Sequence, residues 1–430
     1  MNTWKKYAAA ACTALTLYTP VAAEAHFLSS AQEKEIGTQA ANDFAAEYPV
    51  SHNWVLDHIQ NRLMAYNPDK LWMYGTPGKK RGLEPVLMAK NDLANAVSYG
   101  GGQIFVYEGM FDHLASKVSG AFSSNKNEQT PWKKANIYQM SAMAAVVGHE
   151  IGHWENEDML DQYDADMALR FVAGAVPIGN AWTLLGVTAG ANLIDAFNSR
   201  QMSFDSEKHA DEKSMEYAMY VPEYSVGGEA IVEYREYNFK TMRGQEDEVT
   251  NWLKPHPKSA KRLERALHYQ EVLSKGFVKW NDLAPTFNGV TKCGSSFLYS
   301  LAKQDFDAVE RGFYVVGQIA TAIHFDFCKT RCIKIMREDE VFSDGSPNNV
   351  VLLLEGRGND YKDHVKIIDT YYNVSMRDAK WWAESPWEVI GAQYEEIIKQ
   401  TSELANLAYT RAIIEEYESN RAKYVHKPVE

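Results

Sequence analysis

The run VGHEIGHW at residues 147–154 constrains this chain more than any other feature of its sequence. It is an HExxH pattern inside an apolar, helix-compatible stretch that starts at Ile137. Residues four apart share one face of a helix, so His149 and His153 could hold the same metal ion. Glu150 lies one step round the helix, where its carboxylate could activate a water molecule. The pattern therefore predicts a metal site on one helix, with a further ligand to be found elsewhere in the chain.

Length and composition limit the architecture and the partners. A chain of 430 residues can bury more than one core, and its 45% of hydrophobic residues is typical of globular proteins. A stretch with Pro, Asn and Gly at 280–291 separates two parts of different character, and we place a domain boundary near residue 276. The net charge of -13 argues against nucleic acid or an anionic membrane surface as the main partner, because both require a positive surface.

Local patterns predict an α+β fold. The run Gln103-Ile104-Phe105-Val106-Tyr107 follows three glycines and has the composition of a strand, whereas most of the chain before residue 276 has helical spacing. After the boundary, strand-like runs occur at 333–335, 350–354 and 365–372. We therefore expect a mainly helical domain with a small sheet at 26–275, and a smaller α+β domain of unknown role at 276–430.

The first 25 residues have the pattern of a secretion signal. Lys5 and Lys6 precede a short apolar core at 8–18, and Ala23-Glu24-Ala25 forms an A-x-A cleavage site. The pattern predicts cleavage after Ala25 and an exported protein, periplasmic or extracellular.

Three cysteines follow this predicted signal, and an odd number leaves their pairing open. In an exported chain, Cys293, Cys328 and Cys332 would form one disulfide and leave one free thiol, or form an intermolecular bond. Cys328 and Cys332 could pair with each other only if their segment is not a regular helix, and pairing of Cys293 with either is equally plausible.

The stretch 171–197 is apolar, rich in Gly and Ala, and long enough to cross a membrane. It also contains Pro177, Asn180 and Asn192. We predict a buried helical hairpin here, with contact to a membrane as the alternative. No other segment has the pattern of a membrane span.

A catalytic zinc site needs a third protein ligand. The HExxHxxGxxH arrangement is excluded, because Asn156 and Met159 stand where Gly and His would be required. The next good candidate is Glu207, which shares a helix face with Asp211 four residues later. Glu207 could ligate the metal, while Asp211 could accept a hydrogen bond from a ligand histidine. His209 is the alternative ligand in this segment.

Four motifs in order resemble those of one family. Glu207-x-x-Ala210-Asp211 follows HExxH; Asn95-Ala96 precedes GGQIFVYEGM at 101–110; and His256-Pro257 precedes Arg262. This pattern is similar to that of the family-48 metallopeptidases, the HtpX-like and CAAX-prenyl-protease-like gluzincins. The resemblance covers roughly residues 29 to 270. Phe204 stands where many relatives have Arg, and the chain looks like the exported, soluble branch.

The resemblance implies a zincin-like metallopeptidase domain with one Zn²⁺ per chain. The expected ligands are His149, His153 and Glu207, with Glu150 as general base. His256 and Arg262 would lie near the metal and could stabilise the oxyanion, although a helix-start histidine and an ion-pair arginine are the alternative. The strand at 103–107 would be the edge strand to which an extended peptide substrate adds.

The function that follows is a zinc metalloendopeptidase acting on exported or misfolded proteins. A rival is a non-catalytic binding or chaperone-like module of the cell envelope that uses zinc only as a brace. A third possibility is a latent peptidase that becomes active when a partner moves His256 or the 171–197 stretch.

Overall fold

The computed structural model describes ten segments of the chain, namely residues 28–114, 137–161 with 163, 204–243, 259–281, 283–287, 306–325, 333–337, 350–357 and 363–371. The predicted signal at 1–25, the apolar stretch at 171–197, His256 and the three cysteines after the signal lie outside these residues. Within the described segments, no helix is both long enough and apolar enough to cross a membrane.

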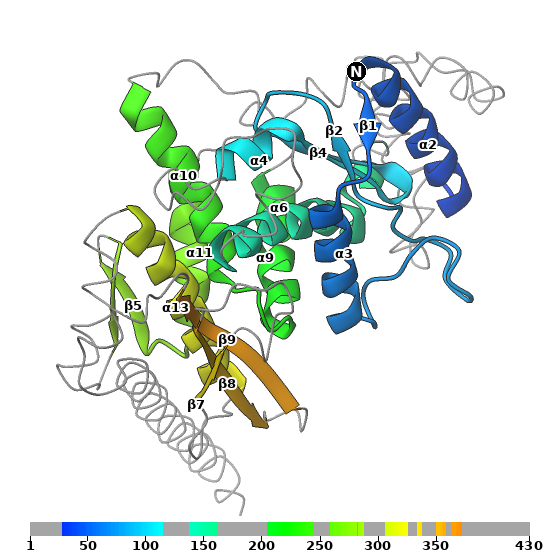
Figure 1. Ribbon diagram of the computed structural model, residues 1–430. Coiled ribbons are helices and arrows are strands. Elements are labelled where there is room, and N and C mark those ends of the chain that lie inside the picture. The colour runs from blue at the N-terminus through cyan, green and yellow to red at the C-terminus, as the bar shows by residue number, and fades with distance from the viewer. Residues whose placement is uncertain are drawn as a thin grey trace, which may run out of the picture.

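The architecture is α+β and mainly helical, as the sequence predicted (Figure 1). The helices are α2 (Ser30–Glu47), α3 (Trp54–Tyr66), η1 (Gly100–Gly102), α4 (Glu108–Leu114), α6 (Ile137–Glu155), α9 (Phe204–Tyr220), α10 (Gly227–Arg243), α11 (Ser259–Leu273) and α13 (Phe306–Phe325). The strands are β1 (Val50–Ser51), β2 (Leu87–Ala89), β3 (Ala96–Tyr99), β4 (Gln103–Tyr107), β5 (Val278–Asn281), β6 (Ala284–Phe287), β7 (Ile333–Arg337), β8 (Val350–Arg357) and β9 (Asp363–Tyr371).

The first sheet has the strand order β1-β2-β4-β3. The strand predicted at 103–107 is confirmed as β4, but the prediction that it forms an edge is wrong. It pairs with β2 in parallel and with β3 in antiparallel orientation, so both of its backbone edges are used. Among the described strands, β3 pairs with β4 alone and forms one edge of this sheet, and β1 forms the other. The sequence run after the three glycines is therefore the interior partner of the edge strand.

Both faces of β4 are buried, because helices cover the sheet on both sides. Ile104 and Val106 face the large helical core, which includes α6. Phe105 and Tyr107 face the other way and pack with Phe44 of α2, whose ring centroid lies 4.6 Å from that of Phe105. A strand with two apolar faces is thus placed between α2 and the helical core, which fixes the sheet relative to α6.

The helical core continues past the predicted domain boundary near residue 276. Helix α13 contributes buried Phe313 and Ile319 to the same hydrophobic cluster as Val146 of α6 and Ile231 of α10. Helix α13 also carries Glu310, whose carboxylate accepts two hydrogen bonds from buried Arg235, at 2.6 and 2.8 Å. The core around α6 therefore includes residues at least as far along the chain as 325.

Close packing of α10 against α13 leads to a prediction about stability. A Cβ at Gly227 would lie 1.9 Å from the carbonyl oxygen of Phe313. We expect Gly227→Ala to lower the free energy of unfolding by about 3 kcal/mol, because the two backbones must separate. Gly78 is the control: its φ is +81° but no atom lies within 4 Å of an added Cβ, so Gly78→Ala should cost only about 1 kcal/mol. Equal urea midpoints for the two variants would contradict the prediction.

Candidate metal centre

Small residues allow α6 and α9 to approach closely beside the HExxH motif. A Cβ at Gly152 would lie 2.9 Å from Cα of Ala210, and a Cβ at Gly148 would lie 3.2 Å from Cα of Ser214. The two glycines are four residues apart on α6, and Ala210 and Ser214 are four residues apart on α9. The two contacts therefore form one seam along the two helices. The seam brings the first turn of α9, with Glu207, against the histidines of α6.

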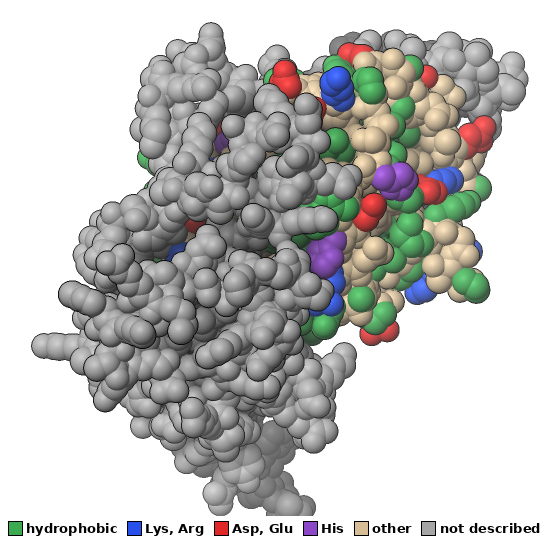
Figure 2. All heavy atoms as spheres, in the orientation of Figure 1, with side chains coloured by type: hydrophobic (Ala, Val, Ile, Leu, Met, Phe, Trp, Pro, Cys, Tyr) green, Lys and Arg blue, Asp and Glu red, His purple; other side chains and the backbone are tan. Residues whose placement is uncertain are grey.

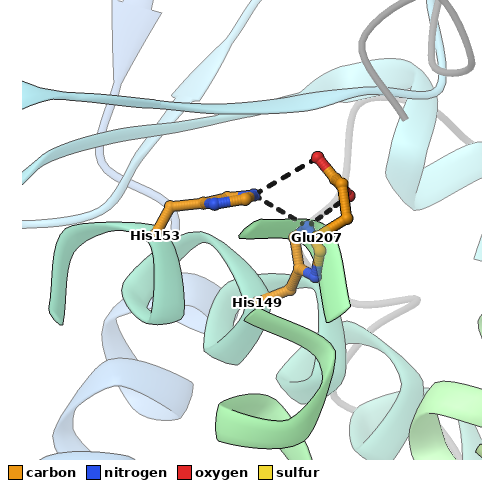
Figure 3. A group of neighbouring side chains, drawn as sticks. All are labelled: His149, His153 and Glu207. Atoms are coloured by element: carbon orange, nitrogen blue, oxygen red, sulfur yellow. Dashed lines mark hydrogen bonds and ion pairs between the residues drawn. The ribbon is translucent and has the colours of Figure 1, made fainter. Parts of the chain in front are cut away.

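The three predicted ligands meet in one buried group (Figure 3). Nε2 of His149 and Nε2 of His153 lie 3.1 Å apart. The carboxylate of Glu207 lies 3.4 Å from Nε2 of His149 and 3.6 Å from Nε2 of His153. The structure thus places these side chains as the sequence predicted, whereas His209, the alternative ligand, is exposed.

The hydrogen bonds on the far side of each ring show what the group can bind. Nδ1 of His149 lies 2.9 Å from Asp211, and Nδ1 of His153 lies 2.7 Å from Asp158. An ionised carboxylate only accepts hydrogen bonds, so each Nδ1 donates to its carboxylate and each Nε2 is left facing the centre of the group. Two Nε2 atoms and the carboxylate of Glu207 therefore face one another, an arrangement that a cation between them would stabilise.

The size of the group fits zinc. Zinc bonds of about 2.0–2.1 Å in a tetrahedral arrangement would separate ligand atoms by about 3.3 Å. The separations here are 3.1, 3.4 and 3.6 Å. Burial opposes a positive charge on His149, yet its hydrogen bonds with Asp211 and Glu207 raise its pKa well above the ordinary value. The surroundings of these rings therefore attract positive charge, and two histidines with one carboxylate match a catalytic zinc site.

Glu150 lies in the same buried region, on the helix that carries both histidines. Its side chain is 1% exposed. Oε1 of its carboxylate has no hydrogen-bond partner among the residues that the structure describes. A buried carboxylate oxygen without a partner is costly, and such oxygens are typical of groups that contact a substrate or water. This position agrees with the predicted role of Glu150 as general base.

Asp158 is a site residue that the sequence interpretation missed. Helix α6 ends at Glu155, and Glu157 adopts a left-handed conformation with φ 61°. This turn brings the Asp158 carboxylate back to Nδ1 of His153. The only sequence signal is an acidic residue one turn after the motif, and its role depends on a backbone turn that periodicity does not reveal.

We expect Asp158→Asn to weaken zinc binding by about 10–100-fold, because the carboxylate fixes the ring orientation and basicity of His153. Zinc affinity measured by competition with a chelator checks this. Asp57→Asn is the matched control, since Asp57 also contacts a histidine, His52 at 3.4 Å, but in an exposed position. An unchanged affinity in Asp158→Asn would show that Asp158 does not orient the ligand.

Arg262 lies beside His149, among three carboxylates. Its guanidinium contacts Asp211 at 2.5 Å, Glu233 at 3.0 Å and Glu229 at 3.1 Å. It is buried on the Nδ1 side of His149, at 3.3 Å, whereas the metal-facing atom of that ring is Nε2. Arg262 is therefore an ion-pair partner, as the alternative predicted, and its role in stabilising an oxyanion stays a prediction. His256, predicted beside it, lies outside the described residues.

Glu229 and Glu233 on α10 were not identified from sequence, and they complete a buried charge cluster around Arg262. His149, Asp211 and Glu229 also lie close enough together to hold a metal. However, the guanidinium of Arg262 already binds both of these carboxylates and supplies their positive charge. Burial raises the pKa of Glu233 to about 7, which reduces the negative charge of the cluster further. The cluster therefore supports Asp211 and is not a second metal site.

The edge of the sheet lies beside the candidate metal ligands. Ser98 and Tyr99 of β3 and Gly100 of η1 line the same small cavity as His153. The predicted substrate strand at 103–107 lies one strand further in. Asn95, which belongs to the motif that precedes the glycines, accepts a hydrogen bond from Tyr107 N through its backbone oxygen at 2.9 Å, at the start of the edge strand.

Comparisons with known proteins agree with this geometry. Residues 73–270 match the model of a family described as Peptidase family M48. The matched range contains β3, the HExxH helix α6, Glu207 and Arg262. A search of curated proteins found no match to this chain.

Proposed function

Because residues 73–270 match the model of peptidase family M48, we propose that this chain is a zinc-dependent metalloendopeptidase with Glu150 as general base. The observation that carries the proposal is the convergence of His149, His153 and Glu207 within 3.6 Å of one another, next to buried Glu150. The match to this family supports a metallopeptidase, and the proposal adds the identity of the metal and the endopeptidase activity.

The mechanism follows from the positions of these side chains. His149, His153 and Glu207 would hold the zinc ion, and Asp211 and Asp158 keep both imidazoles in the Nε2-acceptor tautomer. When bound, zinc supplies a Lewis acid that polarises a carbonyl and makes water acidic near neutral pH. Glu150 accepts the proton of the attacking water and delivers it to the leaving amine. Burial of Glu150 limits competing water, which strengthens both transfers.

The proposed substrate is an extended peptide that adds to β3. The outer edge of β3 is not paired with any described strand. Its backbone groups can hydrogen-bond the backbone of a peptide, whatever side chains the peptide carries. Ser98, Tyr99 and Gly100 place this edge at the cavity shared with His153. Backbone recognition suits a peptidase that acts on many unfolded sequences, in line with the proposed action on exported or misfolded proteins.

Protein or peptide is also the partner that the surface favours. On the face shown in Figure 2, acidic and basic side chains of the described residues are scattered among apolar ones and do not form one basic area. The net charge of -13 agrees with a partner other than nucleic acid. The predicted signal at 1–25 supports export to the periplasm or the extracellular space.

Metal content and cleavage, measured together, test the proposal. We expect one zinc per chain, cleavage of unfolded casein, loss of cleavage with a chelator and recovery with added zinc. The zinc-braced binding module predicts bound zinc, and suppression of aggregation of unfolded protein, without any new peptide termini. A proteomic search for new termini therefore separates the two functions, and zinc-loaded protein that generates none would exclude the peptidase.

A further inference from the structure

We propose that Arg81 is a positioning residue that joins the end of the substrate edge strand to the end of the HExxH helix. This inference rests on the proposed function, since it concerns how the strand β3 and the ligand His153 are held in one relative position. Arg81 lies between β3 and α6 in space but belongs to neither element. Its principal partner, Glu33, lies on α2, outside the residues that match the family.

The guanidinium of Arg81 is bound on several sides at once. Nε and Nη2 donate to the two carboxylate oxygens of Glu33, at 2.8 and 3.0 Å. Nη1 donates to Glu157 at 2.6 Å, and Nη2 also donates to the backbone oxygen of Trp154 at 2.8 Å. A planar guanidinium with several partners fixes their relative positions more firmly than a lysine ammonium would.

Glu33 links this guanidinium to the turn after the edge strand. Its side chain is almost fully buried, with 1% exposed, and Oε1 accepts a hydrogen bond from Gly101 N at 3.1 Å. Gly101 has a φ of +69°, so the turn needs a glycine and has little backbone preference of its own. In the same turn, a Cβ on Gly37 of α2 would lie 1.6 Å from the oxygen of Gly100. Helix α2 therefore determines where β3 ends.

On its other side Arg81 holds the end of α6. The backbone oxygen of Trp154 is one of the last carbonyls of the helix, and it accepts a hydrogen bond from Glu157 N at 3.3 Å as well as the bond from Arg81. Arg81 therefore helps to cap this helix end. Glu157 adopts φ 61°, a conformation unfavourable for a residue with a side chain, and its carboxylate is held by Arg81. The next residue, Asp158, contacts Nδ1 of His153 at 2.7 Å.

The two ends meet at one place. The small cavity beside His153 is lined by Arg81 and its partners together with the end of β3, including Glu33, Arg81, Ser98, Gly100, His153 and Glu157. If Arg81 is removed, the buried carboxylate of Glu33 loses its cation. The turn at Glu157 then loses a direct bond, and the turn at Gly101 stays bonded to a carboxylate that Arg81 no longer holds in place. We therefore expect the distance between the peptide edge and the metal ligands to become variable, which a peptidase cannot tolerate.

Arg81→Met tests this role because methionine keeps an unbranched stem but makes none of the hydrogen bonds. The expected result is a fall in kcat/KM of about 10–100-fold, a zinc affinity several-fold weaker, and faster hydrogen exchange in peptides covering 96–102 and 153–160. Arg62→Met is the matched control: Arg62 also binds a glutamate, Glu223, through Nε and through Nη2 at 2.6 Å, but at a different place. It should change none of the three measurements.

Two further variants keep the test decisive. Arg81→Lys retains the charge and should recover part of the exchange protection, and it provides a folded protein if Arg81→Met does not fold. Glu33→Gln should accelerate exchange at 96–102 more than at 153–160. If Arg81→Met and Arg81→Lys match Arg62→Met in exchange and zinc affinity, the positioning role is wrong. Hydrogen exchange and zinc affinity can both be measured without cleavage. If the wild-type chain cleaves nothing, the proposed function is overturned, but the positioning role of Arg81 is still tested.

Discussion

Replacement of Glu150 by glutamine is expected to abolish peptide cleavage while the protein keeps its zinc and its fold. The amide has nearly the shape of the carboxylate, but it cannot accept the proton of the attacking water or pass it to the leaving amine. General acid–base groups contribute about 10²–10⁴-fold to rates, so kcat should fall by at least about 100-fold. Because Glu150 is buried and Oε1 has no partner among the described residues, neutralising it should not lower stability.

Casein cleavage, zinc content and the unfolding midpoint of the same preparation check this expectation. Glu212→Gln is the matched control, since Glu212 is a half-exposed glutamate on α9 that pairs with Lys208 at 3.7 Å. It should behave as the wild type in all three measurements. Full cleavage by Glu150→Gln would remove the proposed general base and, with it, the proposed mechanism.

Replacement of Glu207 by alanine is expected to remove zinc from the protein. Glu207 is the one ligand that comes from α9, so without it the two histidines would hold zinc from α6 alone. A site filled at 1,000 times its dissociation constant stabilises a fold by about 4 kcal/mol. We therefore expect zinc to raise the unfolding temperature of the wild type strongly and that of Glu207→Ala hardly at all.

The metal-free proteins provide the sharper comparison. Glu207 is fully buried beside further carboxylates, so its removal should not destabilise the metal-free fold by more than a cavity of its size costs, about 1–3 kcal/mol. Asp205→Ala, an exposed change in the same turn, is the control and should keep the full zinc response. A normal zinc response in Glu207→Ala would mean that another side chain is the third ligand.

The parts of the site that the sequence predicted are those fixed by helical spacing. His149 and His153 are four apart on one helix, and Glu207 and Asp211 are four apart on another, so each pair had to share a face. The family resemblance then predicted that the two helices contribute ligands to the same metal ion. The packing seam was also present in the sequence, as Gly148 and Gly152, although its partners could be identified only in three dimensions.

The parts that sequence did not predict depend on turns and on pairing between distant segments. Asp158 reaches His153 through a left-handed residue, and Glu229 and Glu233 meet Arg262 from a third helix. The edge position was assigned to 103–107 because the family resemblance implied it for the strand that follows the glycines. Apolar residues on both faces show that a strand is covered, but they do not show which backbone edge is paired.

The seam between α6 and α9 has a consequence for how metal affinity can change. Gly148, Gly152, Ala210 and Ser214 never touch the metal, yet their size determines how far Glu207 stands from the two imidazoles. A single methyl group added at Gly152 would meet the backbone of α9 at 2.9 Å and push the carboxylate outward. Substitutions that change the distance between α6 and α9 can therefore alter the metal affinity in small steps, without any change to the candidate ligands.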